Sequence, residues 1–347
     1  MAPDNHTSTE VTEQHTDEVI LGIDFGGTKV ALGLADPVTG ALLAEHRLDT
    51  NAPDGAEQAV RRAVTAAREL IAGQPTARLR AVGVVSPGIV LPDRILLAPN
   101  VPGWGSLRLR DEIAQRLGIP APIAVGTDAK AAALAEWRWG ALTDADPALF
   151  LSLGTGLAAA IVVGGTILTG ANGAAGEIGY NLRGVEDSGG HASGSASLEE
   201  AVGGRWLGER ASALLGRPTT AAELFARAEH DEAAQVLMTE ALDELAVHVA
   251  NLAIAIDPAR IAVGGGFTRS AEVVFPALRR RLVQAVPFPP ALVPARFEQD
   301  GALRGAVALA MSVRSESIEN DHSAERQVTL PAQTAAPLAM EGGMPTN

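Results

Sequence analysis

The chain has 347 residues, of which 47% are hydrophobic and 20% charged, so it is long enough for two domains with substantial cores. It contains no cysteine, which excludes disulfides, thiolate metal sites and cysteine nucleophiles. With 27 basic and 41 acidic residues, the net charge is −14, which makes nucleic acid a poor partner. The sequence has no stretch long and apolar enough to span a membrane and no secretory signal, so we expect a cytoplasmic protein.

The two ends of the chain are its most acidic parts. Residues 1–18 hold five acids and no basic residue, and residues 315–347 hold five acids against one arginine. Both segments are polar and lack an apolar pattern, so they have too little apolar surface to offset the entropy lost on ordering. We therefore expect two disordered acidic tails around a folded region.

The folded region opens with short apolar runs separated by glycine, aspartate and proline, which is typical of strands joined by tight turns. The runs VILGIDF, VALGLADP and ALLAEHRL predict three strands between residues 19 and 48. The pattern then predicts a helix over 55–72, a strand over 79–88, a helix over 107–118 and a strand over 122–128.

The second half begins like the first. After an Ala-rich predicted helix over 128–140, residues 147–170 again show an apolar run, a glycine turn and further apolar runs. This indicates a weak repeat of topology rather than of sequence. The remaining predicted elements are helices over 199–215, 219–228, 232–256, 269–286 and 301–313, and a strand with its turn over 261–267. The alternation of strands and helices predicts an α/β fold of two related lobes, with ligands bound where strand ends and glycine turns meet.

Three glycine turns follow apolar runs, at residues 24–29, 154–156 and 264–266. Glycine allows backbone N–H groups to approach a polyanion closely, and threonine hydroxyls add further donors. One such turn is most often a plain turn, but three of them favour a nucleotide site. None matches the P-loop pattern or the GxGxxG fingerprint, so those two nucleotide folds are disfavoured.

Seven motifs carry a family resemblance: DFGGTK, VSPGIV, APNVPGW, TDAKAAALAE, LGTG, GANGAAGEIGY and IAVGGG. In this order and spacing, from about Val19 to Val313, the chain resembles the ROK family of bacterial sugar kinases and sugar-responsive repressors, within the actin-like ATPase superfamily. The resemblance implies two actin-like (RNase H-like) lobes with ATP and a sugar in the cleft between them. It assigns residues 19–127 plus 301–314 to the N-terminal lobe and 128–300 to the C-terminal lobe, and it makes a homodimer possible.

The resemblance also implies roles for individual residues. Asp24 would act on Mg²⁺ through water, and Asp128 would be the catalytic base. An alcohol that attacks a γ-phosphate needs a carboxylate to accept its proton, which supports this role independently. Asp128 also opens a predicted helix, so it can serve as the helix N-cap as well. The residues implied in nucleotide binding are Asp24, Gly26, Gly27, Thr28, Lys29, Gly154, Thr155, Gly156, Gly264, Gly265 and Gly266. Those implied in sugar binding are Asn100, Asp128, Glu177, Tyr180 and Glu199.

The sequence departs from the family pattern at its zinc site. Most ROK kinases have one histidine after GEIG and three cysteines in a following CxCGxxGC stretch. Here the histidine position is Tyr180, and the cysteine positions are Gly190, Ala192 and Ser197. We therefore expect no zinc, since His191 alone cannot complete a four-ligand site. The loop over 183–197 must then be ordered by packing or by substrate, or not at all.

Two further departures flank Asp128, where Thr127 and Lys130 replace the asparagines that are usual in the family. Lys29 and Lys130 are the only lysines in the chain, and both fall inside motifs. Biased composition can account for the scarcity of lysine. The changes around Asp128 and at Tyr180 predict altered recognition of the C1–C2 side of the sugar.

The sequence predicts an ATP-dependent kinase that phosphorylates the primary hydroxyl of a hexose-like ring. The favoured substrate is a C7 cyclitol or a modified amino sugar of an antibiotic-type pathway, and an ordinary glucokinase is the alternative. A sugar-responsive repressor would need a DNA-binding segment of several dozen residues before DFGGTK, whereas 23 residues precede Asp24 here. A non-catalytic sugar sensor is disfavoured because Asp24, Asp128 and the turn glycines are present.

Overall fold

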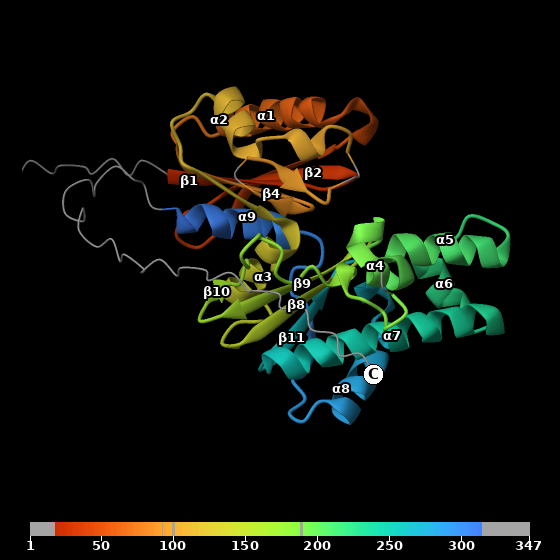
Figure 1. Cartoon of the computed structure of the whole chain (residues 1–347). Coiled ribbons are helices and arrows are strands. Elements are labelled where there is room, and N and C mark those ends of the chain that lie inside the picture. Colours follow the sequence, from red (N-terminus) through yellow and green to blue (C-terminus); the bar gives the residue numbers. More distant parts are fainter. Residues whose placement is uncertain (1–17, 92, 99–100, 188–189, 314–347) are drawn as a thin grey trace, which may run out of the picture. The chain divides into compact units, whose positions relative to one another are not determined.

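The computed structural model describes residues 18–91, 93–98, 101–187 and 190–313 (Figure 1). Within these ranges the chain forms two five-stranded sheets and a two-stranded ribbon of β5 (Ile89–Val90) and β6 (Ile95–Leu96). Apart from Glu18, the two predicted acidic tails lie outside the described residues. No helix in the described part of the chain is long and apolar enough to cross a membrane.

The first sheet has the strand order β3-β2-β1-β4-β7. β1, β2 and β3 form an antiparallel meander, and β4 and β7 continue the sheet in parallel with β1. The predicted strands are therefore present, with glycine or polar turns between them. Their bounds are β1 (Glu18–Phe25), β2 (Lys29–Ala35), β3 (Leu42–Asp49), β4 (Arg78–Ser86) and β7 (Ile123–Thr127).

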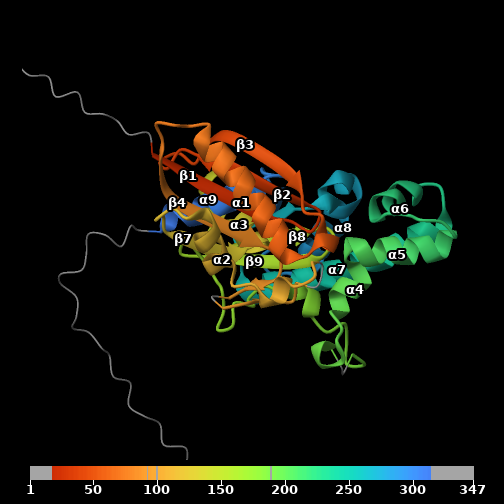
Figure 2. The same ribbon diagram turned by 90° about the horizontal axis from the view of Figure 1, so that it is seen from above.

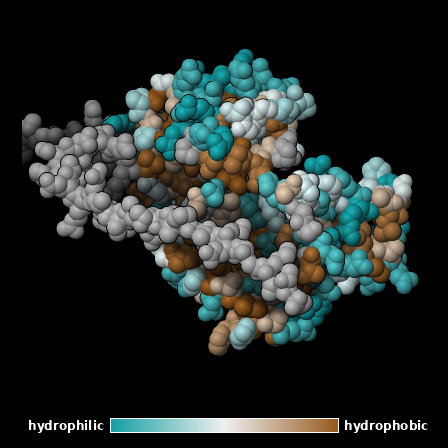
Figure 3. All heavy atoms as spheres, in the orientation of Figure 1, coloured by the Kyte–Doolittle hydropathy of each residue, from teal (hydrophilic) through white to brown (hydrophobic). Residues whose placement is uncertain are grey.

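Helices cover both faces of this sheet. α1 (Ala56–Ala72) and α2 (Leu109–Leu117) lie on one face in both views, and α9 (Gly301–Ser312) lies on the other (Figures 1 and 2). α1 buries one apolar stripe, and its outer side belongs to a mainly hydrophilic surface (Figure 3). α9 packs directly on strand backbone, because a Cβ on Gly83 would overlap the carbonyl of Ala306.

The second sheet repeats the topology of the first, with the order β10-β9-β8-β11-β12. β8, β9 and β10 form an antiparallel meander, and β11 and β12 continue in parallel with β8. The predicted repeat of topology is thus confirmed. The strands are β8 (Ala148–Leu153), β9 (Leu157–Val163), β10 (Thr166–Ile167), β11 (Arg260–Gly264) and β12 (Ala291–Pro294).

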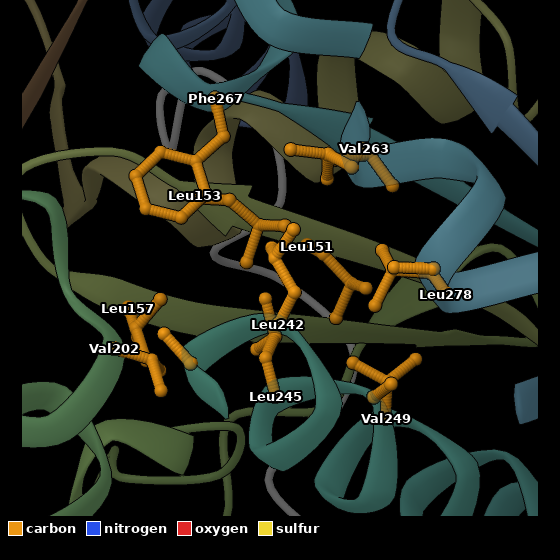
Figure 4. Close-up of a cluster of buried hydrophobic side chains, with 14 of the residues drawn as sticks. Leu151, Leu153, Leu157, Val202, Leu242, Leu245, Val249, Val263, Phe267 and Leu278 are labelled. Atoms are coloured by element: carbon orange, nitrogen blue, oxygen red, sulfur yellow. The ribbon is translucent and has the colours of Figure 1, made fainter. Parts of the chain in front are cut away.

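Alternate residues of this sheet face different helices. One face packs against α3 (Asp128–Trp139), and the other packs against α7 (Glu232–Ile256) and α8 (Ala271–Ala285). Figure 4 shows how side chains from the strands and from α7 point toward one another in the second of these cores. The cluster drawn there includes Leu151, Leu153, Val263, Leu242, Leu245, Val249 and Leu278.

The single helix predicted over 199–215 is wrong. The chain instead forms α4 (Ser197–Val202) and α5 (Gly204–Leu215), with extended backbone at Gly203 between them. The break lets the N–H of Gly204 donate to the carbonyl of Gly154, 2.8 Å away. The remaining short helix is α6 (Ala221–Arg227), and the short 3-10 segments are residues 52–54, 104–106, 178–180, 190–193 and 266–270.

The helix of the second sheet, α3, contacts α9 of the first. The two backbones approach closely where Gly305 faces Ala131, because a Cβ on Gly305 would overlap the Ala131 carbonyl. The fully buried carboxylate of Glu136 holds the end of α3. It accepts the backbone N–H groups of Ala141 and Phe297, each at 2.7 Å. This ties α3 to the segment that leads into α9.

Candidate active site

The first glycine turn joins β1 to β2. The Gly26 N–H donates to the Lys29 carbonyl at 2.8 Å, and the Thr50 hydroxyl donates to the Gly26 carbonyl at 2.7 Å. These bonds fix the turn from inside. Gly27 and Thr28 remain exposed, and no atom lies within 4 Å of the place a Cβ on Gly27 would take. The backbone of the turn is therefore open to a ligand.

Lys29, at the end of this turn, forms an ion pair with Asp49 on β3, with 2.7 Å between Nζ and Oδ1. Both side chains are about two-thirds exposed, at 65% each. The hydrogen bond from Lys29 and its positive charge lower the pKa of Asp49. The structure thus gives Lys29 a partner within the protein, and its expected role in nucleotide binding stays a prediction.

Two carboxyl groups come together at strand ends. Asp24 lies near the end of β1, and Asp128 follows β7 directly; both are only partly accessible to solvent. Burial and the charge of Asp128 raise the pKa of Asp24 to about 7, against an opposing effect from Arg47. Burial also raises the pKa of Asp128, although the Ala129 N–H donates to its Oδ1 at 2.7 Å. Asp128 is therefore close enough for its charge to act on Asp24.

Asp128 is the first residue of α3 rather than its N-cap. The N-cap is Thr127, which has extended backbone and whose hydroxyl donates to the Gly88 carbonyl at 3.0 Å. The N-cap interpretation of Asp128 is therefore wrong by one residue, because the strand continues through Thr127 before the helix begins. Its position at the start of a buried helix nevertheless fixes the carboxyl group in place.

Glu177, Tyr180 and Glu199 lie together, as the resemblance implies. Burial raises the pKa of Tyr180, and the charges of Glu199 and Glu177 raise it further. Glu199 on α4 accepts the Leu157 N–H at 2.8 Å, while its own pKa is raised by burial. Glu177 pairs with Lys130 of α3, with 3.3 Å between Oε1 and Nζ. Asn100, the remaining residue expected here, lies outside the described residues.

The second and third glycine turns are neighbours. The Gly154 N–H donates to Gly156 O at 3.1 Å across the second turn. A Cβ on Gly154 would lie 3.5 Å from the nitrogen of Gly266. Gly265 has a φ of 89° and packs against the Leu153 backbone, so that only glycine fits there. Thr155 is exposed at the tip of the second turn, and Gly264 pairs with Ser152 in the sheet.

Two basic side chains, Lys130 and Arg47, act on the acids of the site although neither was among the expected site residues. Lys130 is 7% exposed and its charge acts on Asp128; its signal was that it is one of two lysines, placed inside a motif. Arg47 on β3 pairs with Ala31, which pairs with Asp24 on the neighbouring strand. Nothing in the sequence singles out Arg47, because it looks like any exposed strand residue.

The loop over 183–197 replaces the zinc-binding region of the family. Within its described part, Arg183 forms an ion pair with Glu244 of α7, and the Ser193 hydroxyl donates to the Gly190 carbonyl at 2.8 Å. The rings of Tyr180 and His191 meet edge to face, with centroids 5.4 Å apart. These contacts join the loop to α7 through Arg183 and to Tyr180 through His191. Among the described residues, no group of three or more His, Asp or Glu side chains is placed to hold a metal ion.

Comparison with known proteins places these features in a family. The sequence model of the ROK family matches residues 20–313. A glucokinase of Thermotoga maritima is 31% identical over 77% of this chain and 88% of its own length. A ROK hexokinase of Thermus thermophilus is 30% identical, with a TM-score of 0.71 over 84% of this chain and 97% of that one.

A ROK glucokinase of Streptomyces griseus, solved with glucose and AMPPNP, is also 30% identical, with a TM-score of 0.66 over 84% of this chain and 99% of that one. These matches agree with the seven motifs and confirm the expected α/β fold of two actin-like lobes. The chain belongs to the ROK family.

Proposed function

We propose that this protein transfers the γ-phosphoryl group of ATP to the primary hydroxyl of a hexose-like ring. The observation that carries the proposal is the placement of Asp128 beside Asp24, at the strand ends of the first sheet. One carboxylate is then available for proton transfer and the other for the metal-bound phosphates. Named kinases with about 30% identity over most of the chain support the same reaction class.

Asp128 accepts the proton of the attacking hydroxyl. Burial raises its pKa toward the working pH, which favours proton transfer in the transition state. The Ala129 N–H and the first turn of α3 hold the carboxylate, so its oxygen needs no reorientation before the reaction.

The three glycine turns hold the nucleotide. Gly26, Gly27 and Thr28 line the phosphates, Gly154 to Gly156 form the second phosphate turn, and Gly264 to Gly266 lie near the adenosine. Asp24 fits a magnesium site, because its buried carboxylate is destabilised by a second acid and would be stabilised by a divalent cation. Mg²⁺, when bound, would neutralise charge on the phosphates, and Asp24 would reach it through water.

The substrate ring lies against Asn100, Asp128, Glu177, Tyr180 and Glu199. Carboxylate oxygens accept directed hydrogen bonds from hydroxyls, so three acids around one ring can select an epimer. Tyr180 and Lys130 change the side that faces C1 and C2, while the side near the primary hydroxyl keeps the family motif. This division supports a C7 cyclitol or another modified hexose as substrate.

An ordinary glucokinase is the second candidate, supported by the glucokinases among the relatives. The family is not limited to glucose, since an N-acetylgalactosamine kinase of Shewanella is 30% identical over 83% of this chain. Specificity constants for glucose, mannose, N-acetylmannosamine, amino-glucose and a valienone-like cyclitol decide between the two. Glucose as the best substrate contradicts the modified-ring proposal, and no phosphorylation of any ring contradicts the kinase proposal itself.

A further inference from the structure

The ion pair between Lys130 and Glu177 lies on the wall of the proposed sugar site. Lys130 stands two residues after Asp128 on α3, and Glu177 directly precedes the short 3-10 turn that carries Tyr180. The side chains are 9% and 19% exposed, and their charged atoms are 3.3 Å apart. Both charges act on the Asp128 carboxyl, Glu177 raising its pKa and Lys130 lowering it. The pair is therefore part of the environment of the reacting group.

Among the residues that the structure describes, Lys130 has fewer hydrogen-bond partners than its ammonium has donors. An ammonium has three N–H donors, yet Glu177 is its one hydrogen-bond partner among the residues that the structure describes. A buried charge without a full set of partners is costly, so such a group is rarely kept for stability alone. The remaining donors are suited to oxygen atoms of a ligand.

The pairing also limits which ligands fit. Lys130 offsets the charge of Glu177, so this carboxylate attracts a second cation less strongly than an unpaired one would. A ligand oxygen beside Lys130 gains a charge-assisted hydrogen bond, whereas a ligand ammonium meets a like charge in a site shielded from water.

We propose that Lys130 is a specificity-determining residue, which donates to an oxygen on the C1–C2 side of the ring and excludes rings with an ammonium group there. This inference rests on the proposed function, because that function places the ring against Glu177. It narrows the substrate class to neutral polyhydroxylated rings, cyclitols included, and removes amino sugars with a free amine on this side.

The test compares glucose with glucosamine, which differ by an ammonium in place of one hydroxyl on this side. Binding of each sugar is measured by calorimetry in the presence of a non-hydrolysable ATP analogue, at a pH where the amine is protonated. We expect wild type to bind glucosamine at least tenfold more weakly than glucose. K130M keeps the unbranched side chain, one atom shorter, without its charge, and we expect it to reduce this ratio at least tenfold.

Two further variants separate charge from structure. K130R retains the cation and should retain the discrimination. R138M removes a cation from the last turn of the same helix, away from the site, and should leave the ratio unchanged. A thermal melt checks each variant, and K130N, with the residue usual in the family, replaces K130M if the latter does not fold.

A purely structural role would weaken the binding of both sugars together and leave their ratio unchanged, which would overturn the proposal. Equal binding of the two sugars to wild type would overturn it as well. So would the absence of any gain for glucosamine in K130M, including the case in which neither sugar binds. The proposed function is tested separately, with the substrate panel. If no ring in the panel is phosphorylated in the presence of ATP, the kinase proposal itself is wrong.

Discussion

The two sheets have the same strand order and the same pairing directions, but different residues follow their strands. The first sheet ends in acids, with Asp24 at β1 and Asp128 after β7. The second ends in glycines, with Gly154 after β8 and Gly264 closing β11. The topology brings strand ends to one edge in both cases, and the side chains at that edge decide what each sheet contributes. Under the proposed function, the first sheet supplies the catalytic acid and one phosphate turn, and the second supplies the other two nucleotide turns.

The glycines of the two sheets also differ in what surrounds them. Gly27 in the first turn has open space around it, which suits the ligand contact proposed for it. Gly265 in the third turn faces the Leu153 backbone, so packing requires a glycine there. The two glycines thus differ in whether a side chain could be accommodated without a ligand present.

The largest expected effect is on the acids of the first sheet. Asp128→Asn should lower turnover by about two to four orders of magnitude, because an amide of the same shape cannot accept the proton of the alcohol. Turnover is measured beside a thermal melt, which should show a normally folded protein. Activity within tenfold of wild type would remove Asp128 from the role of base.

The contrast between Gly265 and Gly27 predicts that an alanine lowers stability at the first position and ATP binding at the second. Gly265→Ala should destabilise the protein by about 2 to 5 kcal/mol, since it combines an unfavourable backbone conformation with an overlap on Leu153. Gly27→Ala should leave the melting temperature almost unchanged and raise the KM for ATP. Melting curves and ATP titrations of the two variants check this pair. A destabilised Gly27→Ala protein would show that the first turn is also a packing element.

Asp24→Asn should make the metal-free protein more stable, but only at higher pH. The pKa of Asp24 is raised from 3.8 to about 7, so the folded chain binds a proton more tightly than the unfolded chain. The stabilisation that comes from proton binding by Asp24 is therefore fully present below about pH 4 and is lost as the pH rises through about 7. The variant should gain about 1 to 3 kcal/mol at pH 8 after allowance for screening by solvent.

Melting curves of wild type and Asp24→Asn in chelator, at pH 5 and pH 8, test the direction of this effect. The stability difference should grow with pH. A difference that is the same at both pH values would show that Asp24 acts through packing rather than through its charge.

The smallest expected effect is that of chelation on folding. The protein has no cysteine and carries Tyr180 where most ROK kinases have a zinc-binding histidine, so we expect no stoichiometric zinc and no change in melting temperature with chelator. Elemental analysis of the purified protein checks this. About one zinc per chain would contradict it and would point to ligands outside the family motifs.

The order of strands and helices could be predicted because apolar runs and glycine turns alternate clearly along the chain. The break at Gly203 escaped prediction although the Gly203–Gly204 pair is a turn signal, because apolar residues continue at helical spacing across it. The position of the break depends on Gly204 reaching Gly154, about 50 residues away. β12 escaped prediction as well, because ALVP is a four-residue edge strand next to prolines.

For the site, motifs pointed to the acids and glycines, and the structure brings Glu177, Tyr180 and Glu199 together. The sequence did not reveal how charges would pair. Lys29, which is expected at the nucleotide, pairs with Asp49, and Lys130, which replaces a family asparagine, pairs with Glu177. Ion pairs between distant segments depend on strand register and helix orientation, which local patterns do not specify.

The position of α9 affects how the protein is made. The first sheet is synthesised early, yet the face of Gly22 and Gly83 is covered mainly by residues 301–312. At about 5 to 20 residues per second, the roughly 170 residues between β7 and α9 take on the order of ten seconds or more to translate. During that interval, the nascent chain presents an apolar sheet face on the ribosome. Burial of this face must await the synthesis of α9, so the core of the first half is completed only after the second half has been made.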